Sequence, residues 1–207
     1  MEYFVIDTNL FFNMEAKLGM GNDTETIIRQ LTAAIQHAQK TEKVAVLMPP
    51  RIVEEIKSFF EDPEQPFLQE FFACISVQSP DLLNLKIPAE LLARYIEESR
   101  LRAYRGMTIA EEEIAKTGTQ FMGSEMLGKK EFQMSVGHII KSFRERFRNA
   151  TRTKFLDSVA DFDLIALAMQ KNAYLVTSDE GVTQWGRLCG VKEMDSQIFG
   201  KKMLKYL

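Results

Sequence analysis

The chain has 207 residues, enough for one sizeable domain or for a compact domain that carries a large insertion. Its 26 basic and 29 acidic residues leave a formal net charge of −3, which argues against a uniformly basic nucleic-acid binder but allows local patches of either sign. Two cysteines and two histidines argue against a disulfide framework and a zinc site. Without a secretory leader or an apolar run of about 20 residues, we expect a cytoplasmic protein with no membrane association.

Short runs of apolar and β-branched residues predict buried strands, and they lie at residues 3–7, 44–48, 73–78 and 173–177. Between the first two, residues 25–40 place apolar side chains at helical spacing. After the second, Pro49 and Pro50 lead into another helical pattern at residues 51–60. This β-α-β-α-β order predicts an α/β fold, a parallel sheet flanked by helices.

The middle of the chain, residues 88–154, is almost entirely helix-forming. The boundary signals predict separate helices, with breaks at Gly106 and at residues 122–130. We therefore expect a helical insertion at 88–154 that protrudes from a sheet domain formed by residues 1–87 and 155–207.

Carboxylates stand where two of the predicted strands finish, at Asp7 and at Asp179. In an open α/β sheet, sites form in the crevice outside the carboxyl ends of the strands. Asp161 and Asp163 lie at the start of the helix that precedes the last strand, so the same edge can gather them. Because residues two apart do not share a helix face, we expect the regular helix to begin between or near these two.

Two further acidic positions belong to the same prediction. Asp157 lies four residues before Asp161, so a helical turn would put both on one face. Glu54 and Glu55 follow the second strand, and the spacing leaves open which one points into the crevice. Crowded carboxylates repel one another and raise their pKa values unless a cation neutralises them, and oxygen ligands suit Mg²⁺ or Mn²⁺. The acids therefore predict metal-dependent phosphodiester hydrolysis.

Each acid also has a plain structural explanation. Asp7, Asp157 or Asp161 alone would serve as a helix N-cap, and Asp179 would serve as a turn residue. The combination favours a site, because Lys171 is the only basic residue between Asp157 and Asp179.

A cationic stripe precedes these acids. On a helix, the spacing of 3, 4 and 4 residues aligns four basic side chains: Lys141, Arg144, Arg148 and Arg152. A solvated helix face is the alternative explanation, but the position just before Asp157 favours contact with RNA phosphates.

Four blocks in this order and spacing resemble a known family: "FVIDTNLF", "VLMPPRIVEEI", "FLDSVADFDLIALA" and "YLVTSDEGVTQWG". Together with the helical segment before "FLDS", they look like the minimal protein-only ribonuclease P family of PIN-domain nucleases, earlier labelled RNA ligase partner proteins. The resemblance covers nearly the whole chain. Asn9 stands where some members have serine, and either side chain can hydrogen-bond a carboxylate.

The resemblance implies a metal-dependent endoribonuclease that removes the 5′ leader of precursor tRNA, leaves a 5′-phosphate and needs no RNA subunit. It implies that the catalytic acids are Asp7, Asp157, Asp161, Asp163 and Asp179. The metal ligands would be Asp7, Asp161, Asp163, Asp179 and, matching the family glutamate, Glu55. Residues 88–154 would then recognise RNA and assemble the chain into a large homo-oligomer.

Other classes fit less well. A phosphatase of the haloacid dehalogenase type needs a second aspartate two positions after the first, where this chain has Asn9. A general or toxin-type PIN ribonuclease shares the acids but is usually shorter and lacks a long helical insertion. A non-catalytic RNA-binding PIN scaffold would normally have lost some of the acids.

Overall fold

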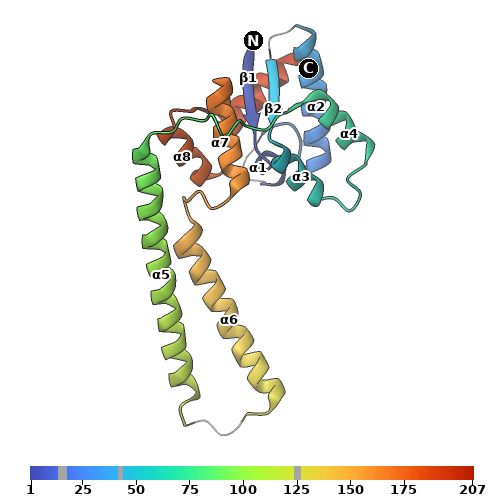
Figure 1. Cartoon of the computed structure of the whole chain (residues 1–207). Coiled ribbons are helices and arrows are strands. Elements are labelled where there is room, and N and C mark those ends of the chain that lie inside the picture. The colour runs from blue at the N-terminus through green and yellow to red at the C-terminus, as the bar shows by residue number, and fades with distance from the viewer. Residues whose placement is uncertain (14–17, 42–43, 124–126) are drawn as a thin grey trace. The chain divides into compact units, whose positions relative to one another are not determined.

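The computed structural model describes residues 1–13, 18–41, 44–123 and 127–207, which form two compact units. The first unit is a sheet domain made of Met1–Ile87 and Leu156–Leu207, and the second is the helical insertion Pro88–Phe155 (Figure 1). The insertion contains α5 (Ala89–Phe121) and α6 (Lys129–Arg152). The sheet domain contains β1 (Glu2–Ile6), α1 (Asn9–Phe12), α2 (Thr24–Lys40), β2 (Val44–Met48), α3 (Pro50–Ser58), α4 (Pro66–Cys74), β3 (Ser76–Val77), α7 (Val159–Lys171), β4 (Tyr174–Val176), α8 (Glu180–Leu188), β5 (Lys192–Met194), α9 (Ser196–Met203) and a 3₁₀ turn (Leu204–Tyr206).

The sheet has five parallel strands in the order β3-β2-β1-β4-β5, so the predicted parallel α/β fold is confirmed. Its centre is β1, where Phe4 is in register with Val46 of β2 on one side and with Tyr174 of β4 on the other. Phe4, Val5 and Ile6 are fully buried, as expected for a strand covered on both faces.

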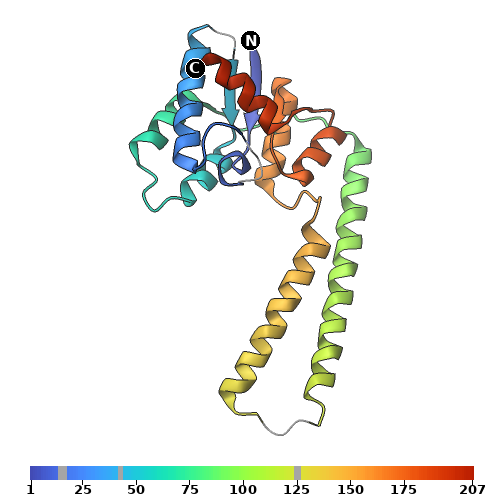
Figure 2. The same cartoon turned by 180° about the vertical axis from the view of Figure 1, so that it is seen from behind.

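Helices cover the sheet in two layers. α2 packs against α4 and α9, whereas α7 packs against β1, β4 and α8. Right-handed crossovers place α2 and α4 on one face of the sheet and α7 and α8 on the other. Figures 1 and 2 view these layers from opposite sides, with α9 beside α2 in Figure 2.

The strand order makes the carboxyl end of β1 a natural binding crevice. From β1 the chain adds β2 and β3 in one direction, and it adds β4 and β5 in the other. In open α/β sheets, ligands bind where the order reverses in this way. Asp7 follows β1 at this switch point.

The sequence prediction is incomplete at both edges of the sheet. The run at 73–78 begins as the end of α4, because Phe67, Leu68 and Phe71 bury one helical face after Pro66 at the helix start, and only Ser76–Val77 pairs as a strand. β5 was missed because Lys192–Met194 is a short, charged edge strand without an apolar run.

The helical insertion also differs from its prediction at Gly106. α5 runs without a break from Ala89 to Phe121. Gly106 is instead a contact point between the helices, because a Cβ atom there would lie 2.5 Å from Cε2 of Phe147 on α6. A small residue is required at this crossing, so the glycine serves packing and not termination.

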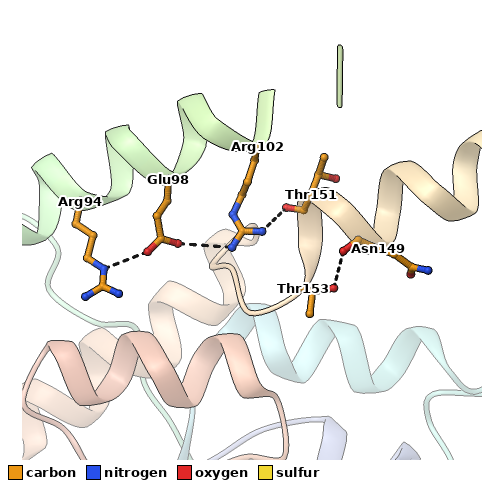
Figure 3. Close-up of polar contacts among 6 residues, drawn as sticks. All are labelled: Arg94, Glu98, Arg102, Asn149, Thr151 and Thr153. Carbon is orange, nitrogen blue, oxygen red and sulfur yellow. Dashed lines mark hydrogen bonds and ion pairs between the residues drawn. The ribbon is translucent and has the colours of Figure 1, made fainter. Parts of the chain in front are cut away.

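Polar contacts fasten α5 to α6 as an antiparallel pair. Figure 3 shows Arg102, which donates to the backbone carbonyl of Thr151 at 3.0 Å and lies 3.5 Å from Glu98. Farther along, Arg146 donates to Glu112 at 2.5 Å and to the buried Glu113 at 2.6 Å. Across the described ranges, no helix combines the length and apolar character needed to cross a bilayer.

Candidate active site

Asp7 lies at the centre of the carboxyl edge, 2% exposed. Its carboxylate accepts hydrogen bonds from Thr8 Oγ1 at 3.1 Å, from Asn9 Nδ2 at 3.0 Å and from Thr177 Oγ1 at 2.6 Å. Burial raises the pKa of Asp7, and these hydrogen bonds partly offset that rise. The expected hydrogen bond from Asn9 is therefore confirmed. The N-cap residue of α1 is Thr8, but the backbone N–H of Asn9 also donates to the carboxylate of Asp7, so Asp7 combines a local role at the start of α1 with its place in the crevice.

Thr177 links β1 to the end of β4. While its hydroxyl donates to Asp7, the same oxygen accepts the backbone N–H of Asp179 at 3.0 Å. Asp179 is the N-cap of α8, where its Oδ1 accepts the N–H of Val182 at 2.9 Å. The alternative of a local structural role for Asp179 is therefore partly right, since one carboxylate oxygen is used for capping.

α7 begins near its two acids, as predicted, although not between them. The helix begins at Val159, before both Asp161 and Asp163, because Ser158 is its N-cap and accepts the N–H of Ala160 at 3.0 Å. Asp161 is half-buried in the first turn, and Asp163 is buried. Asp157 precedes the cap and is exposed, so it does not share a helical turn with Asp161.

The two adjacent glutamates of α3 have different surroundings. Glu54 is exposed and its carboxylate forms an ion pair with Lys57 at 3.0 Å. Glu55 has a raised pKa, first through desolvation and then through repulsion by Asp7, and it shares a hydrogen bond with Thr8. Of the two, Glu55 therefore faces the crevice.

The acids influence one another most strongly at Asp161. Burial, and then the negative charges of the surrounding carboxylates, raise the pKa of Asp161 to about 7. The contributing carboxylates are Asp7, Asp179, Asp157 and Glu55. We call these five residues, Asp161 and its four neighbours, the acidic cluster. It draws side chains from the ends of β1 and β4, from the second half of α3, from the first turn of α7 and from the residue before the N-cap of α7.

Asp163 is not among the acids that raise the pKa of Asp161. Its Oδ2 accepts a hydrogen bond from Nη1 of Arg51 at 2.5 Å, and its Oδ1 is buried with no hydrogen-bond partner among the described residues. The structure therefore pairs Asp163 with a cation.

The acidic cluster has the chemical composition of a divalent-cation site. All its side-chain donors are oxygens, and the raised pKa of Asp161 indicates that the protein does not neutralise the negative charge of the neighbouring carboxylates. Among the residues that the structure describes, however, no three acidic, histidine or cysteine side chains stand close enough to hold an ion directly. The carboxylates would thus have to turn toward the ion to bind it.

The predicted basic residues lie on α6 of the insertion, outside the sheet domain. Lys141, Arg144, Arg148 and Arg152 are all exposed. Lys141, Arg144 and Arg148 form no ion pair with any described residue, whereas Arg146 on the same helix is used by Glu112 and Glu113. The helix therefore carries cationic side chains that internal contacts do not use.

Three residues at the edge were not assigned a role from the sequence: Thr8, Thr177 and Arg51. The two threonines directly follow a strand or a strand-end aspartate, which is a weak signal for a hydrogen bond to the site. The partner of Arg51 is 112 residues away, so no sequence spacing could have revealed it.

Comparisons with known proteins identify the family of this chain. The family model described as a PINc domain ribonuclease matches residues 3–207. An RNA-free ribonuclease P from Hyperthermus butylicus is 32% identical over 96% of this chain and 86% of its own length. Proteins of the same name from Thermococcus kodakarensis and Pyrococcus furiosus are 32% and 30% identical, over 95% and 99% of this chain and 91% and 93% of their own lengths. The chain therefore belongs to the protein-only ribonuclease P family of PINc-domain ribonucleases.

Proposed function

We propose that this protein cuts precursor tRNA at the junction between the 5′ leader and the mature tRNA. The observation that carries the proposal is the convergence of the acidic cluster around Asp161, with Asp7 at the switch point of the sheet. Its relatives are named as ribonuclease P enzymes that lack RNA, which supports the substrate and the absence of an RNA subunit. The cytoplasm is the proposed place of action.

PIN nuclease domains generally depend on a divalent metal ion, and we propose Mg²⁺ here, with Mn²⁺ as a substitute. Asp7, Asp161, Asp179 and Glu55 would hold it. When bound, the ion would activate water and stabilise charge on the phosphate oxygens. The chain's own part is orientation: Thr8, Asn9 and Thr177 fix the carboxylate of Asp7 in one position.

The reaction is a hydrolysis. The oxygen of a water molecule forms a bond to phosphorus, and the bond from phosphorus to the 3′ oxygen of the leader breaks. The leader then ends in a 3′ hydroxyl, and the tRNA begins with a 5′ phosphate. Asp157, exposed at the rim beside Ser158, is the proposed group that orients the attacking water.

The insertion is proposed to hold the RNA away from the cut. Lys141, Arg144, Arg148 and Arg152 would contact phosphates, which fixes position without reading sequence. Support comes from the exposure of these four side chains on α6.

We also propose that the insertion assembles the protein into a large homo-oligomer. Its helices expose large apolar side chains that a separate chain could cover: Leu92, Ile96, Met107, Ile114, Phe132 and Met134. Mass measurement by light scattering tests this, and a monomer at micromolar concentration would refute it.

The function is tested with purified protein and a labelled precursor tRNA, with Mg²⁺ and with EDTA. Cleavage is expected only with the ion and only while the acidic cluster is intact, so Asp161→Asn should be inactive. Glu54→Gln is the matched control, because Glu54 is an exposed acid of α3 that pairs with Lys57 outside the cluster. Activity in EDTA, or full activity of Asp161→Asn, would overturn the proposal.

A further inference from the structure

An ion pair between α3 and α7 lies beside the acidic cluster. Nη1 of Arg51 lies 2.5 Å from Oδ2 of Asp163. The two partners differ sharply in burial, since the side chain of Asp163 is 3% exposed and that of Arg51 is 57% exposed. The buried acid therefore anchors a cation whose outer part remains in solvent.

Helix geometry places this arginine next to the acids. Arg51 and Glu55 are four residues apart on α3, so their side chains lie on one face of that helix. Glu55 in turn shares a hydrogen bond with Thr8 and is repelled by Asp7. Arg51 is thus about one helical turn from Glu55, a member of the acidic cluster.

Asp163 has a different environment from the cluster. It follows Asp161 by two residues and therefore points from a different side of α7. One of its two carboxylate oxygens, Oδ2, is occupied by Arg51. The nearest countercharge to Asp163 is Arg51, at hydrogen-bonding distance.

Stability alone does not account for this pair. A buried carboxylate is costly to desolvate, and an apolar residue of similar size often serves a core equally well or better. An ion pair with a solvent-exposed arginine offsets only a small part of this desolvation free energy. The arrangement does fix a guanidinium at the crevice, with one nitrogen on Asp163 and no other hydrogen bond to a described residue.

We propose that Arg51 binds a phosphate of the RNA strand at the site of cleavage, and that Asp163 is its positioning residue and not a metal ligand. A guanidinium has five donors in a planar fork that matches phosphate oxygens, so the N–H groups not used by Asp163 remain for the RNA. The charge of Arg51 also offsets part of the repulsion between the acidic cluster and the RNA backbone. The assignment rests on the proposed function.

RNA binding without divalent ions tests the role of Arg51. Precursor tRNA is titrated in EDTA over a range of KCl concentrations with the wild type, Arg51→Gln, Arg51→Lys and Arg187→Gln. Arg187 is the matched control, a 64% exposed arginine that pairs with Glu193 in the same unit. Loss of one phosphate contact should weaken binding several-fold and reduce the slope of log K against log salt by about 0.7 to 0.9.

The lysine and control variants define the outcomes. Arg51→Lys should retain the slope of log K against log salt, because it keeps the positive charge. It should bind RNA more weakly than the wild type, because lysine lacks the planar set of guanidinium donors. Arg187→Gln should match the wild type. If Arg51→Gln had the same RNA affinity and the same salt slope as the wild type, the ion pair would have only a structural role. That result would overturn the assignment of Arg51 as an RNA-binding residue.

The role of Asp163 is tested by calorimetric titration with Mn²⁺. Asp163→Asn should bind Mn²⁺ as the wild type does, whereas Asp161→Asn should bind it at least tenfold more weakly. Equal loss in both variants would make Asp163 a ligand and overturn its assignment. These readouts do not require cleavage, so a wild type that binds RNA through Arg51 but fails to cut precursor tRNA would refute only the proposed function.

Discussion

Replacing Asp161 by asparagine should stabilise the metal-free protein at neutral pH while abolishing its activity. The carboxyl group of Asp161 has its pKa raised from 3.8 to about 7 by burial and by the negative charges around it. Asparagine keeps the shape of the side chain and removes the charge. The acidic cluster would thus lose one of its mutually repelling groups.

The sign and the pH window follow from this shift. Between about pH 4 and pH 7, the folded protein holds a proton on Asp161 that the unfolded chain releases, so stability falls as pH rises through this window. A shift from 3.8 to about 7 sets a ceiling of about 4 kcal/mol at 1.36 kcal/mol per unit. Because Asp161 is only half-buried, solvent screening reduces this to roughly 1–2 kcal/mol.

Thermal unfolding in EDTA measures the effect at pH 4 and at pH 8. Asp161→Asn should unfold about 4 °C above the wild type at pH 8, and the difference should vanish near pH 4. Glu54→Gln, the control, should change neither value. A variant less stable than the wild type at pH 8 would refute the electrostatic reasoning, because it would show that the charged carboxylate stabilises the fold.

Three further predictions concern the site and the insertion. Glu55→Gln should lower kcat/KM at least tenfold, whereas Glu54→Gln should leave it unchanged; a larger loss in Glu54→Gln would show that the wrong glutamate was assigned. Thr177→Val should cost about 1–2 kcal/mol in chemical denaturation, because Asp7 loses a hydrogen bond and the Asp179 N–H loses its acceptor, and Thr177→Ser should restore stability and activity. Replacing both Arg144 and Arg148 by glutamine should weaken RNA binding and reduce its salt slope by about 1.5; an unchanged slope would make these arginines a solvated helix face.

The sequence predicted the centre of the sheet better than its edges. β1, β2 and β4 are buried on both faces, so their apolar runs are continuous and easily recognised. β5 is an edge strand with charged residues, and β3 retains only two residues after α4 ends, so neither gives a clear periodic signal. Gly106 illustrates the same difficulty, because only a neighbouring helix explains why a glycine lies within α5.

The candidate site shows a similar division. Carboxylates at strand ends are visible in the sequence because the topology brings such ends together, as for Asp7 and Asp179. The sequence does not show as clearly which side of a helix faces the crevice, because that depends on where the helix begins. Ser158 is the N-cap of α7, and Asp163 on this helix hydrogen-bonds Arg51. Long-range pairs of this kind leave no trace in local spacing.

The most direct test of the central claim is to map the ends of the products that the wild type makes from a precursor tRNA with Mg²⁺. We expect a single cut that leaves a 5′ phosphate on the first nucleotide of the mature tRNA and a 3′ hydroxyl on the leader. Scattered cuts, or equal cutting of an unrelated RNA, would contradict the claim and indicate a general PIN ribonuclease. Binding without any cut would indicate a scaffold.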